Sequence, residues 1–242
     1  MKKVWIDAGH GGKDPGAVGN GLREKDIVLT VSLGVKERLE RDYEGVKVFL
    51  SRSTDVFLEL KERTDAANKA GADILVSIHC NAGGGAGGFE SFRYTNALAA
   101  SRSLQNVLHT EIMGALKPFG VIDRGQKAAN LHMCRESKMP AVLSENLFID
   151  VTTDVAKLKR QEVIDALIVG HVSGIAKYLG LKKKKDAVVA NDKVNVTVNG
   201  KRIKDGKLVN GVTYVPLRAV GDALGAKIGF DNKTKTATLD KK

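Results

Sequence analysis

The first 180 residues contain short apolar runs that are rich in β-branched residues. Each run is only a few residues long, and polar or glycine-rich sequence follows it, which is typical of a buried β-strand. We interpret four runs in this way: residues 4–6, 46–50, 74–78 and 141–143.

Amphipathic stretches lie between these runs. In residues 25–41, Ile27, Val31, Val35 and Leu39 recur at the spacing of one helical face, and charged residues occupy the other side. Strands that alternate with helices predict an α/β fold with a twisted, mostly parallel sheet flanked by helices. Similar helical patterns cover residues 58–70, 97–116 and 155–179, the last as one long closing helix.

The pattern changes after residue 186. Residues 194–198 alternate between apolar and polar positions, which indicates a strand, and the turn dipeptide Asn199-Gly200 follows. A second turn is expected at Asn210-Gly211, a short helix at residues 217–224, and a hairpin that pairs 227–230 with 236–239. This part of the chain is therefore predicted to be a second, small β-rich domain with one helix.

Charge divides the chain at the same place. Of the 39 Lys and Arg and 28 Asp and Glu residues, residues 181–242 hold 15 basic residues and 6 Asp, a balance of +9. Residues 1–180 keep 24 basic and 22 acidic residues, a balance of +2. We therefore expect a catalytic domain at residues 1–180, a basic linker at 181–188 and a small domain at 189–242.

The start of the chain does not read as a secretory segment. Asp7 and His10 interrupt the apolar run almost at once, whereas a signal peptide needs about 7–15 consecutive apolar residues. No stretch reaches the roughly 20 apolar residues of a membrane span. We expect synthesis in the cytoplasm without a signal peptide, so that an extracellular substrate would be reached after lysis or through holin pores.

Polar residues follow the predicted strands where a catalytic metal could bind. His10 follows the first strand, His79 ends the third, and Glu24 opens the first helix. The carboxyl ends of parallel strands meet at one edge, the usual ligand site of open α/β sheets. Two histidines and a carboxylate are a common catalytic zinc set that leaves a position for water. Glu145 follows the fourth strand and could transfer protons there.

Taken singly, these residues have ordinary structural explanations. A histidine at a strand end is often a hydrogen-bonded structural residue, and Glu24 alone would be a solvated carboxylate favoured by the helix dipole. Their expected convergence on one edge is what favours a metal site.

Six segments resemble the zinc N-acetylmuramoyl-L-alanine amidase family, in that family's order. The resemblance spans residues 4 to about 180 and implies one Zn²⁺ held by His10, Glu24 and His79, with Glu145 as the catalytic carboxylate. The family often continues after this Glu with glycine, whereas Asn146 follows here. The segments are IDAGHGGKDPGA (6–17), EKD (24–26), LSRSTD (50–55), RTDAAN (63–68), SIHCNA (77–82) and PAVLSE (140–145).

The resemblance also implies a substrate and a reaction. Zinc-activated water would hydrolyse the amide bond between N-acetylmuramic acid and L-alanine in peptidoglycan, and Glu145 would pass the proton to the leaving amine. By a looser inference, Asn81, Arg124, Asn130 and Arg135 would bind the substrate.

The second domain resembles the copper amine oxidase N-terminal-like stalk domain through VNGK (198–201), GVTYVPLR (211–218) and LGA (224–226). It contains no His or Cys, so copper is not implied. Its charge favours attachment to anionic teichoic acids or peptidoglycan carboxylates. Nucleic acid is not expected as a partner, because Tyr214 and Phe230 are the only aromatic residues there. A solvated basic spacer is the alternative.

The sequence thus predicts a peptidoglycan hydrolase for cell-wall lysis, either a phage endolysin or a mother-cell lysis enzyme of a sporulating bacterium. A non-enzymatic wall-binding or amidase-activating protein with the same fold is the alternative. Such proteins usually lose a ligand or the catalytic Glu, whereas this chain has all four residues. A different zinc amidase or peptidase is also open, and the sequence does not decide the oligomeric state.

Overall fold

The structure is a computed structural model that describes residues 1–184, 194–209, 212–232, 234 and 236–240. The chain divides into two compact units, Met1–Lys183 and Lys184–Lys242, and each is described by itself. Residues 185–188 of the expected linker and the expected turn at Asn210-Gly211 lie outside the described residues.

The first unit is built on a six-stranded sheet in the order β4-β1-β5-β8-β6-β7. The first four strands in this order are parallel, β6 is antiparallel to β8, and β7 is parallel to β6. The predicted α/β fold with a mostly parallel sheet is confirmed. The strands are β1 (Lys2–Ala8), β4 (Val46–Leu50), β5 (Ile74–Asn81), β6 (Phe89–Tyr94), β7 (Asp123–Ala129) and β8 (Ala141–Phe148).

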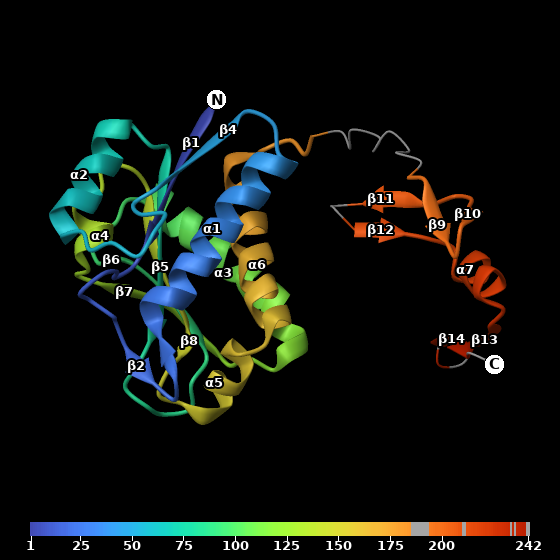
Figure 1. Cartoon of the computed structure of the whole chain (residues 1–242). Helices are drawn as coiled ribbons and strands as arrows, with labels where there is room; N and C mark the ends of the chain where they lie inside the picture. Colours follow the sequence, from blue (N-terminus) through green and yellow to red (C-terminus); the bar gives the residue numbers. More distant parts are fainter. Residues whose placement is uncertain (185–193, 210–211, 233, 235, 241–242) are drawn as a thin grey trace. The chain divides into compact units, whose positions relative to one another are not determined.

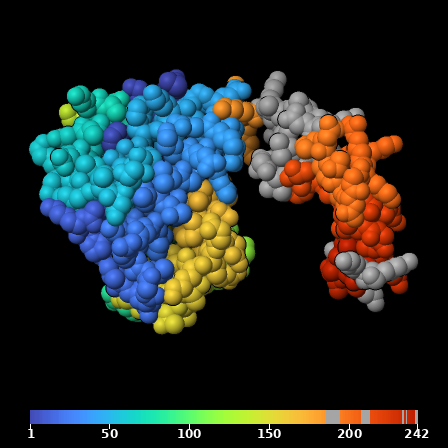
Figure 2. All heavy atoms as spheres, viewed as in Figure 1, coloured from blue at the N-terminus to red at the C-terminus, as the bar shows by residue number. Residues whose placement is uncertain are grey.

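Helices cover both faces of this sheet (Figure 1). On one face, α1 (Glu24–Asp42), α3 (Ala99–Leu116) and α6 (Gln161–Leu179) bury a large apolar core with the strands. On the other face, α2 (Leu60–Ala70) and α4 (His132–Arg135) pack over a smaller core around Trp5 and Leu75. Figure 2 shows α1 and α6 side by side on the surface of this unit.

Two glycines let α3 and α6 pack closely. A Cβ atom at Gly170 would lie 2.6 Å from the Cα of Ile112, and one at Gly174 would lie 2.8 Å from the Cα of Leu108. Because backbone cannot yield as a side chain can, larger residues would force the two helices apart.

The expected long closing helix is two helices, α5 (Thr152–Leu158) and α6. Arg160 is extended, with φ −94° and ψ 125°, and separates them. Leu158 and Val163 on either side of the break both enter the main core, so the apolar spacing conceals the bend. The remaining short elements are β2 (Val18–Gly19), β3 (Leu22–Arg23) and the 3₁₀ helix η1 (Lys117–Phe119).

The second unit consists of antiparallel hairpins and one helix, as predicted. Asn199 and Gly200 have φ values of 48° and 76°, the positive values that a tight hairpin turn requires. The predicted hairpin pairs Lys227 with Asp240 and Asp231 with Thr236. The elements are β9 (Val196–Val198), β10 (Lys201–Ile203), β11 (Lys207–Val209), β12 (Val212–Tyr214), α7 (Leu217–Leu224), β13 (Lys227–Asp231) and β14 (Thr236–Asp240).

Within the described part of the chain, no helix combines the length and the apolar character that crossing a bilayer would need.

Candidate functional site

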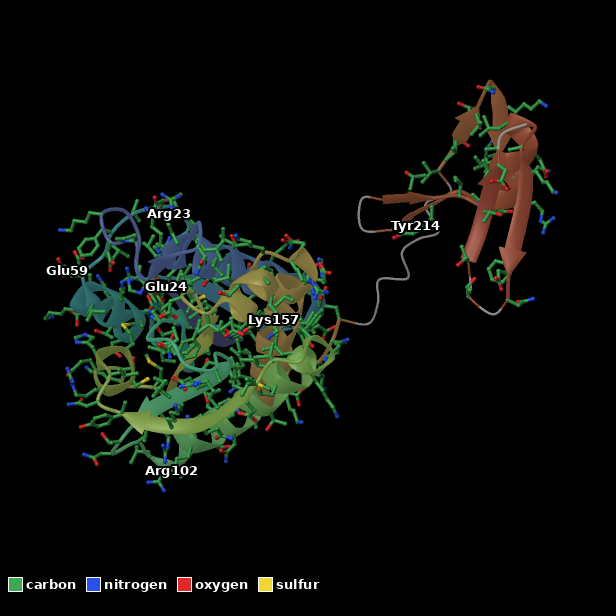
Figure 3. The ribbon with its side chains drawn as sticks, turned by 90° about the horizontal axis from the view of Figure 1, so that it is seen from below. Arg23, Glu24, Glu59, Arg102, Lys157 and Tyr214 are labelled. Carbon is green, nitrogen blue, oxygen red and sulfur yellow. The ribbon has the colours of Figure 1, made fainter. Side chains whose placement is uncertain are left out.

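The four residues predicted at the centre of the site come from neighbouring elements of the first unit. His10 follows β1, His79 lies near the end of β5, and Glu24 is the first residue of α1. Glu145 lies on β8, directly opposite His79 in the strand register. Figure 3 shows Glu24 pointing into the unit, whereas Arg23 beside it points outward.

Three of these side chains bring their donor atoms into one triangle. Nε2 of His10 lies 3.2 Å from Nδ1 of His79, and Oε1 of Glu24 lies 3.0 Å and 2.9 Å from these two nitrogens. Around a tetrahedral ion with bonds of about 2.0–2.1 Å, ligand atoms are about 3.3 Å apart. Two imidazole nitrogens and one carboxylate oxygen are also donors that zinc prefers, so the triangle fits a zinc ion.

Further hydrogen bonds orient the triangle. Nδ1 of His10 lies 2.8 Å from Oδ2 of Asp14, which favours a proton on Nδ1 and leaves Nε2 free to bind a metal. The backbone N–H of Cys80 donates to Oε1 of Glu24, and that of Ala17 donates to Oε2. Burial raises the pKa of Glu24, but the hydrogen bonds to His10 and His79 outweigh it and hold that pKa well below its usual range.

Close backbone approach explains two of the glycines near His10. A Cβ atom at Gly9 would lie 2.4 Å from the His79 ring, and one at Gly16 would lie 2.6 Å from Oε2 of Glu24. His10 itself has a φ of 58°, a conformation that non-glycine residues rarely adopt. The loop therefore needs other contacts to hold it in place.

Two buried arginines supply these contacts, and sequence reasoning did not identify them. Arg63 donates to the carbonyls of Ala8 and His10 and to Oδ1 of Asp7, at 2.6, 2.7 and 2.9 Å. Arg52 donates to the carbonyls of Ala8, Gly9 and Lys25, at 3.0, 2.7 and 2.8 Å. A lone Arg in a loop, such as Arg52, or on a helix, such as Arg63 on α2, is normally solvated, so the local pattern around neither residue indicated burial.

Arg52 and Arg63 also connect the segments that carry the three candidate ligands. Lys25, whose carbonyl Arg52 binds, follows Glu24 in the chain. Asp7, which pairs with Arg63, accepts a hydrogen bond from Ser77, two residues before His79. Both arginine side chains are only 3% exposed, so these contacts are shielded from water.

Glu145 faces the triangle and differs from Glu24 in its surroundings. Its Oε2 atom is buried and has no hydrogen-bond partner among the described residues. Burial raises the pKa of Glu145 to about 7. The charge on His79 opposes this rise, whereas the negative charges of Glu24 and Glu90 reinforce the rise. A carboxyl group with a pKa near neutrality can both accept and donate a proton at working pH.

A cavity of about 300 Å³ adjoins the triangle. His10 and His79 form one side of it, and residues 57–60, between β4 and α2, form another. The cavity offers space for a substrate group next to the candidate ligands.

The predicted substrate residues fall into two separate pairs. Asn81 and Arg124 both donate to the buried carboxylate of Glu90, at 2.7 and 2.8 Å. Asn130 and Arg135 instead bond to each other at 2.7 Å, and Arg135 lines a different hollow of about 190 Å³.

Sequence reasoning missed Glu90 and Lys127, which also binds Glu90. No apolar run marked strands β6 and β7, so the alternation of their side chains could not be followed.

Two of the other histidines, His109 and His171, make structural contacts, and Nε2 of His132 lies 3.2 Å from the hydroxyl of Thr64. His171 is fully buried between the carbonyl of Leu167 and the hydroxyl of Ser144. His109 bridges Ser91 and Asp123 in a Ser-His-Asp array. Ser91 is completely buried, so this array cannot act as a nucleophile on a substrate and instead fixes α3 to the sheet.

Comparisons with known proteins agree with this geometry. The sequence pattern of the N-acetylmuramoyl-L-alanine amidase family matches residues 4–177, and that of the copper amine oxidase N-terminal domain matches residues 176–239. A sporulation-specific N-acetylmuramoyl-L-alanine amidase of Bacillus subtilis is 47% identical over 183 residues, covering 76% of this chain and 70% of the relative. An endolysin of Bacillus phage SPP1 is 50% identical over 185 residues, covering 76% and 68%.

Solved structures show the same fold in the first unit. The catalytic domain of the amidase CwlV from Bacillus (Paenibacillus) polymyxa var. colistinus superposes with a TM-score of 0.70 at 38% identity. It covers 75% of this chain and 100% of that domain. An N-acetylmuramoyl-L-alanine amidase from Clostridium difficile 630 also reaches 0.70, at 34% identity, covering 74% and 97%.

Proposed function

Because the chain belongs to the N-acetylmuramoyl-L-alanine amidase family, we propose that His10, Glu24 and His79 hold one catalytic zinc ion and that Glu145 is the proton-transferring carboxylate. Family membership makes the chain a peptidoglycan hydrolase that cleaves the bond between N-acetylmuramic acid and L-alanine. One observation carries the zinc proposal: three donor atoms lie within about 3 Å of one another, and Glu145, opposite His79 in the sheet, has a buried oxygen without a hydrogen-bond partner among the described residues.

Zinc in such a site would supply an activated water and polarise the scissile carbonyl. Glu145 accepts the proton from the attacking water and donates it to the nitrogen of the departing L-alanine. Its pKa of about 7 suits both steps, because a weaker base would not take the proton and a weaker acid would not return it.

The surrounding residues keep the site assembled before substrate arrives. Asp14 fixes the ring of His10, while Arg52 and Arg63 fix the backbone on both sides of it. A preorganised site avoids the cost of ordering these groups during the reaction.

Asn81 and Arg124 are proposed to contact substrate near Glu145, because their shared partner Glu90 pairs with Glu145 in the sheet. Asn130 and Arg135 would bind a more distant part of the glycan or peptide. Their contact with each other and with a separate hollow supports a distant location.

The second unit is proposed to attach the enzyme to the cell wall through anionic teichoic acids or peptidoglycan carboxylates. Its charge supports this, and Tyr214 and Phe230 are 57% and 60% exposed. Figure 3 shows Tyr214 in this unit. The relatives include an endolysin and a sporulation amidase, so we propose that the enzyme acts in cell-wall lysis. It would be synthesised in the cytoplasm and would reach the wall after lysis or through holin pores.

Metal analysis and product analysis test the catalytic proposal together. We expect about one zinc per chain, loss of wall lysis after treatment with a chelator, and recovery when zinc is returned. Mass spectrometry of digested walls should find free peptides that begin with L-alanine and glycans with intact lactyl groups. Full activity of metal-stripped protein would contradict the zinc proposal, and cleavage at another bond would contradict the substrate assignment.

A further inference from the structure

A group of cations surrounds the buried carboxylate of Glu90 on β6. The Glu90 side chain is 4% exposed and accepts hydrogen bonds from Asn81, Arg124 and Lys127. One carboxylate cannot neutralise two cations, so the group keeps one positive charge in excess. The Arg124 and Lys127 side chains remain 29% and 39% exposed, so this charge is accessible from solvent.

Contacts within the unit position both cations, and each cation keeps hydrogen-bond donors that these contacts do not use. The guanidinium carbon of Arg124 lies 4.6 Å from the ring centre of Phe148. Nε of Arg124 donates a hydrogen bond to Glu90, and Nη1 donates one to the carbonyl of Gly87. Nζ of Lys127 lies 5.8 Å from the ring centre of Phe92, and this ammonium group donates only to Glu90 among the described residues. Nη2 of Arg124 and two protons of the Lys127 ammonium group have no acceptor within the described part of the chain.

The group lies one strand beyond Glu145. Glu90 and Glu145 are directly opposed on β6 and β8, which places their Cα atoms about 4.5–5.5 Å apart with both side chains on one face. Across the sheet, the strand order β1-β5-β8-β6-β7 therefore places His10, His79, Glu145, Glu90 and Lys127 in succession.

This order sets the direction of the substrate. Glu145 delivers its proton to the nitrogen of L-alanine, so we expect the departing peptide to leave on the Glu145 side of the triangle, toward β6 and β7. The lactyl carboxyl group of the sugar is consumed in the amide bond, so near the cleaved bond the peptide is the part that carries free carboxylates. A carboxylate on the residue after L-alanine lies about 7 Å from the cleaved bond at extended-chain spacing.

We propose that Arg124 and Lys127, positioned by Glu90, form a subsite for a free carboxylate on the second residue of the stem peptide. The proposal rests on the proposed function, because Glu145 defines the side from which the peptide leaves. It makes the enzyme selective for walls in which this carboxyl group is free over walls in which it is amidated.

Two defined substrates test this selectivity with the zinc-loaded full chain. They are N-acetylmuramoyl-L-alanyl-D-glutamate and its α-amide, N-acetylmuramoyl-L-alanyl-D-isoglutamine, each with the γ-carboxyl group blocked as a methylamide, so that only the α-carboxyl group differs in charge. We expect kcat/KM to favour the free acid roughly 5- to 20-fold, mostly through KM, the size of one partly exposed charge-assisted contact. Lys127→Met should bring the ratio close to one, and Lys127→Glu should reverse it. Lys117→Met, an exposed control on η1 ten residues before Lys127, should keep the wild-type ratio.

Calorimetric titration with the peptide products separates the subsite from the catalytic proposal. With the γ-carboxyl group blocked as a methylamide in both, L-alanyl-D-glutamate should bind more tightly than L-alanyl-D-isoglutamine, and Lys127→Met should remove the difference. Equal affinity for the two dipeptides would overturn the subsite, whether or not the chain hydrolyses either substrate. Cleavage of neither substrate would contradict the proposed function alone. A Lys127→Met variant that weakens both dipeptides equally would also overturn the proposal, because the lysine would then not discriminate the carboxylate.

Discussion

At the scale of single residues, two glutamates that both interact electrostatically with His10 and His79 have opposite acid–base properties. Glu24 accepts hydrogen bonds from backbone N–H groups and lies against both imidazoles, so its charged form is favoured. Glu145 has a buried oxygen without a partner among the described residues, so its neutral form is favoured. The first is suited to binding a cation permanently and the second to exchanging a proton.

Replacing Glu145 tests this division of roles. Glu145→Gln keeps the shape but cannot take or return a proton, so turnover should fall at least about 100-fold, the usual contribution of general acid–base catalysis. Zinc content should stay the same, because Glu145 is not one of the three proposed ligands. The exposed Glu44→Gln is the control and should behave as wild type. Wall lysis by Glu145→Gln at the native rate would mean that another group transfers the proton.

The sequence predicted these four residues because each was expected at a strand or helix end and because the segments that contain them resemble one family. Glu145 instead lies within β8, which continues to Phe148. The sequence could not predict Arg52, Arg63 or Glu90. Burial of a charged side chain depends on partners that are far away in the chain, such as Asp7 for Arg63, 56 residues earlier.

The two buried arginines act on the backbone, which makes Arg63→Lys informative. Lysine keeps the charge but lacks the planar guanidinium group, which hydrogen-bonds to Ala8, His10 and Asp7 at the same time. Zinc affinity should fall about 10- to 100-fold, as for other changes to groups that orient a ligand. Competition with a chromophoric chelator measures it, with Arg38→Lys on α1 as the half-exposed control. Unchanged affinity in Arg63→Lys would show that the His10 loop holds its conformation without this contact.

At the scale of elements, predictability followed the hydrophobic pattern. Strands β1, β5 and β8 lie inside the sheet and have continuous apolar runs because both of their faces are covered, and they were predicted together with the edge strand β4. Strand β6 alternates buried Phe89 with Glu90, whose carboxylate belongs to the site, and β7 is an edge strand without an apolar run. Neither therefore carried the signal of a core strand.

One contact between elements is expected to depend on pH. Helix α6 meets β8 through His171, which donates from Nδ1 to the carbonyl of Leu167 at 2.8 Å. Its Nε2 accepts from the hydroxyl of Ser144 at 2.9 Å. Burial lowers the pKa of His171 to about 4 from its ordinary value of 6.5, although the bond to Leu167 opposes the change. The folded chain thus holds this imidazole neutral.

The stability from His171 is complete above pH 6.5 and is lost as the pH falls toward 4. Over that range the unfolded chain takes up a proton that the folded chain refuses, so the free energy of unfolding falls by up to about 3 kcal/mol. His171→Gln keeps one donor and one acceptor but does not titrate. Urea unfolding of both chains at pH 7 and pH 4.5 measures the difference, and wild type should lose more stability than His171→Gln. An identical loss in both chains would mean that His171 is not held neutral.

At the scale of the whole molecule, the chain combines a unit that contains the site with a unit that carries most of the charge. Lys184–Lys242 holds 13 of the basic residues and 6 Asp, which gives +7 of the net +11. The first unit includes the start of the basic run, because the N–H of Glu44 donates to the carbonyl of Lys182. A shortened chain that ends after Lys183 therefore keeps this contact and the bridge between Tyr43 and Lys183.

Shortening the chain in this way tests whether the second unit attaches the enzyme to the wall. The shortened chain should keep its zinc and cleave small soluble muropeptides at the native rate, but it should bind intact walls less well. Binding of the full chain should weaken as salt rises from about 0.05 to about 0.5 M, because the Debye length shrinks from more than about 10 Å toward about 3 Å. The shortened chain should depend on salt much less, since it carries only +4. Sedimentation with purified walls, with and without teichoic acids, measures both effects and shows which polymer is bound. A shortened chain that sediments as completely as the full chain at every salt concentration would exclude attachment and leave the second unit as a spacer.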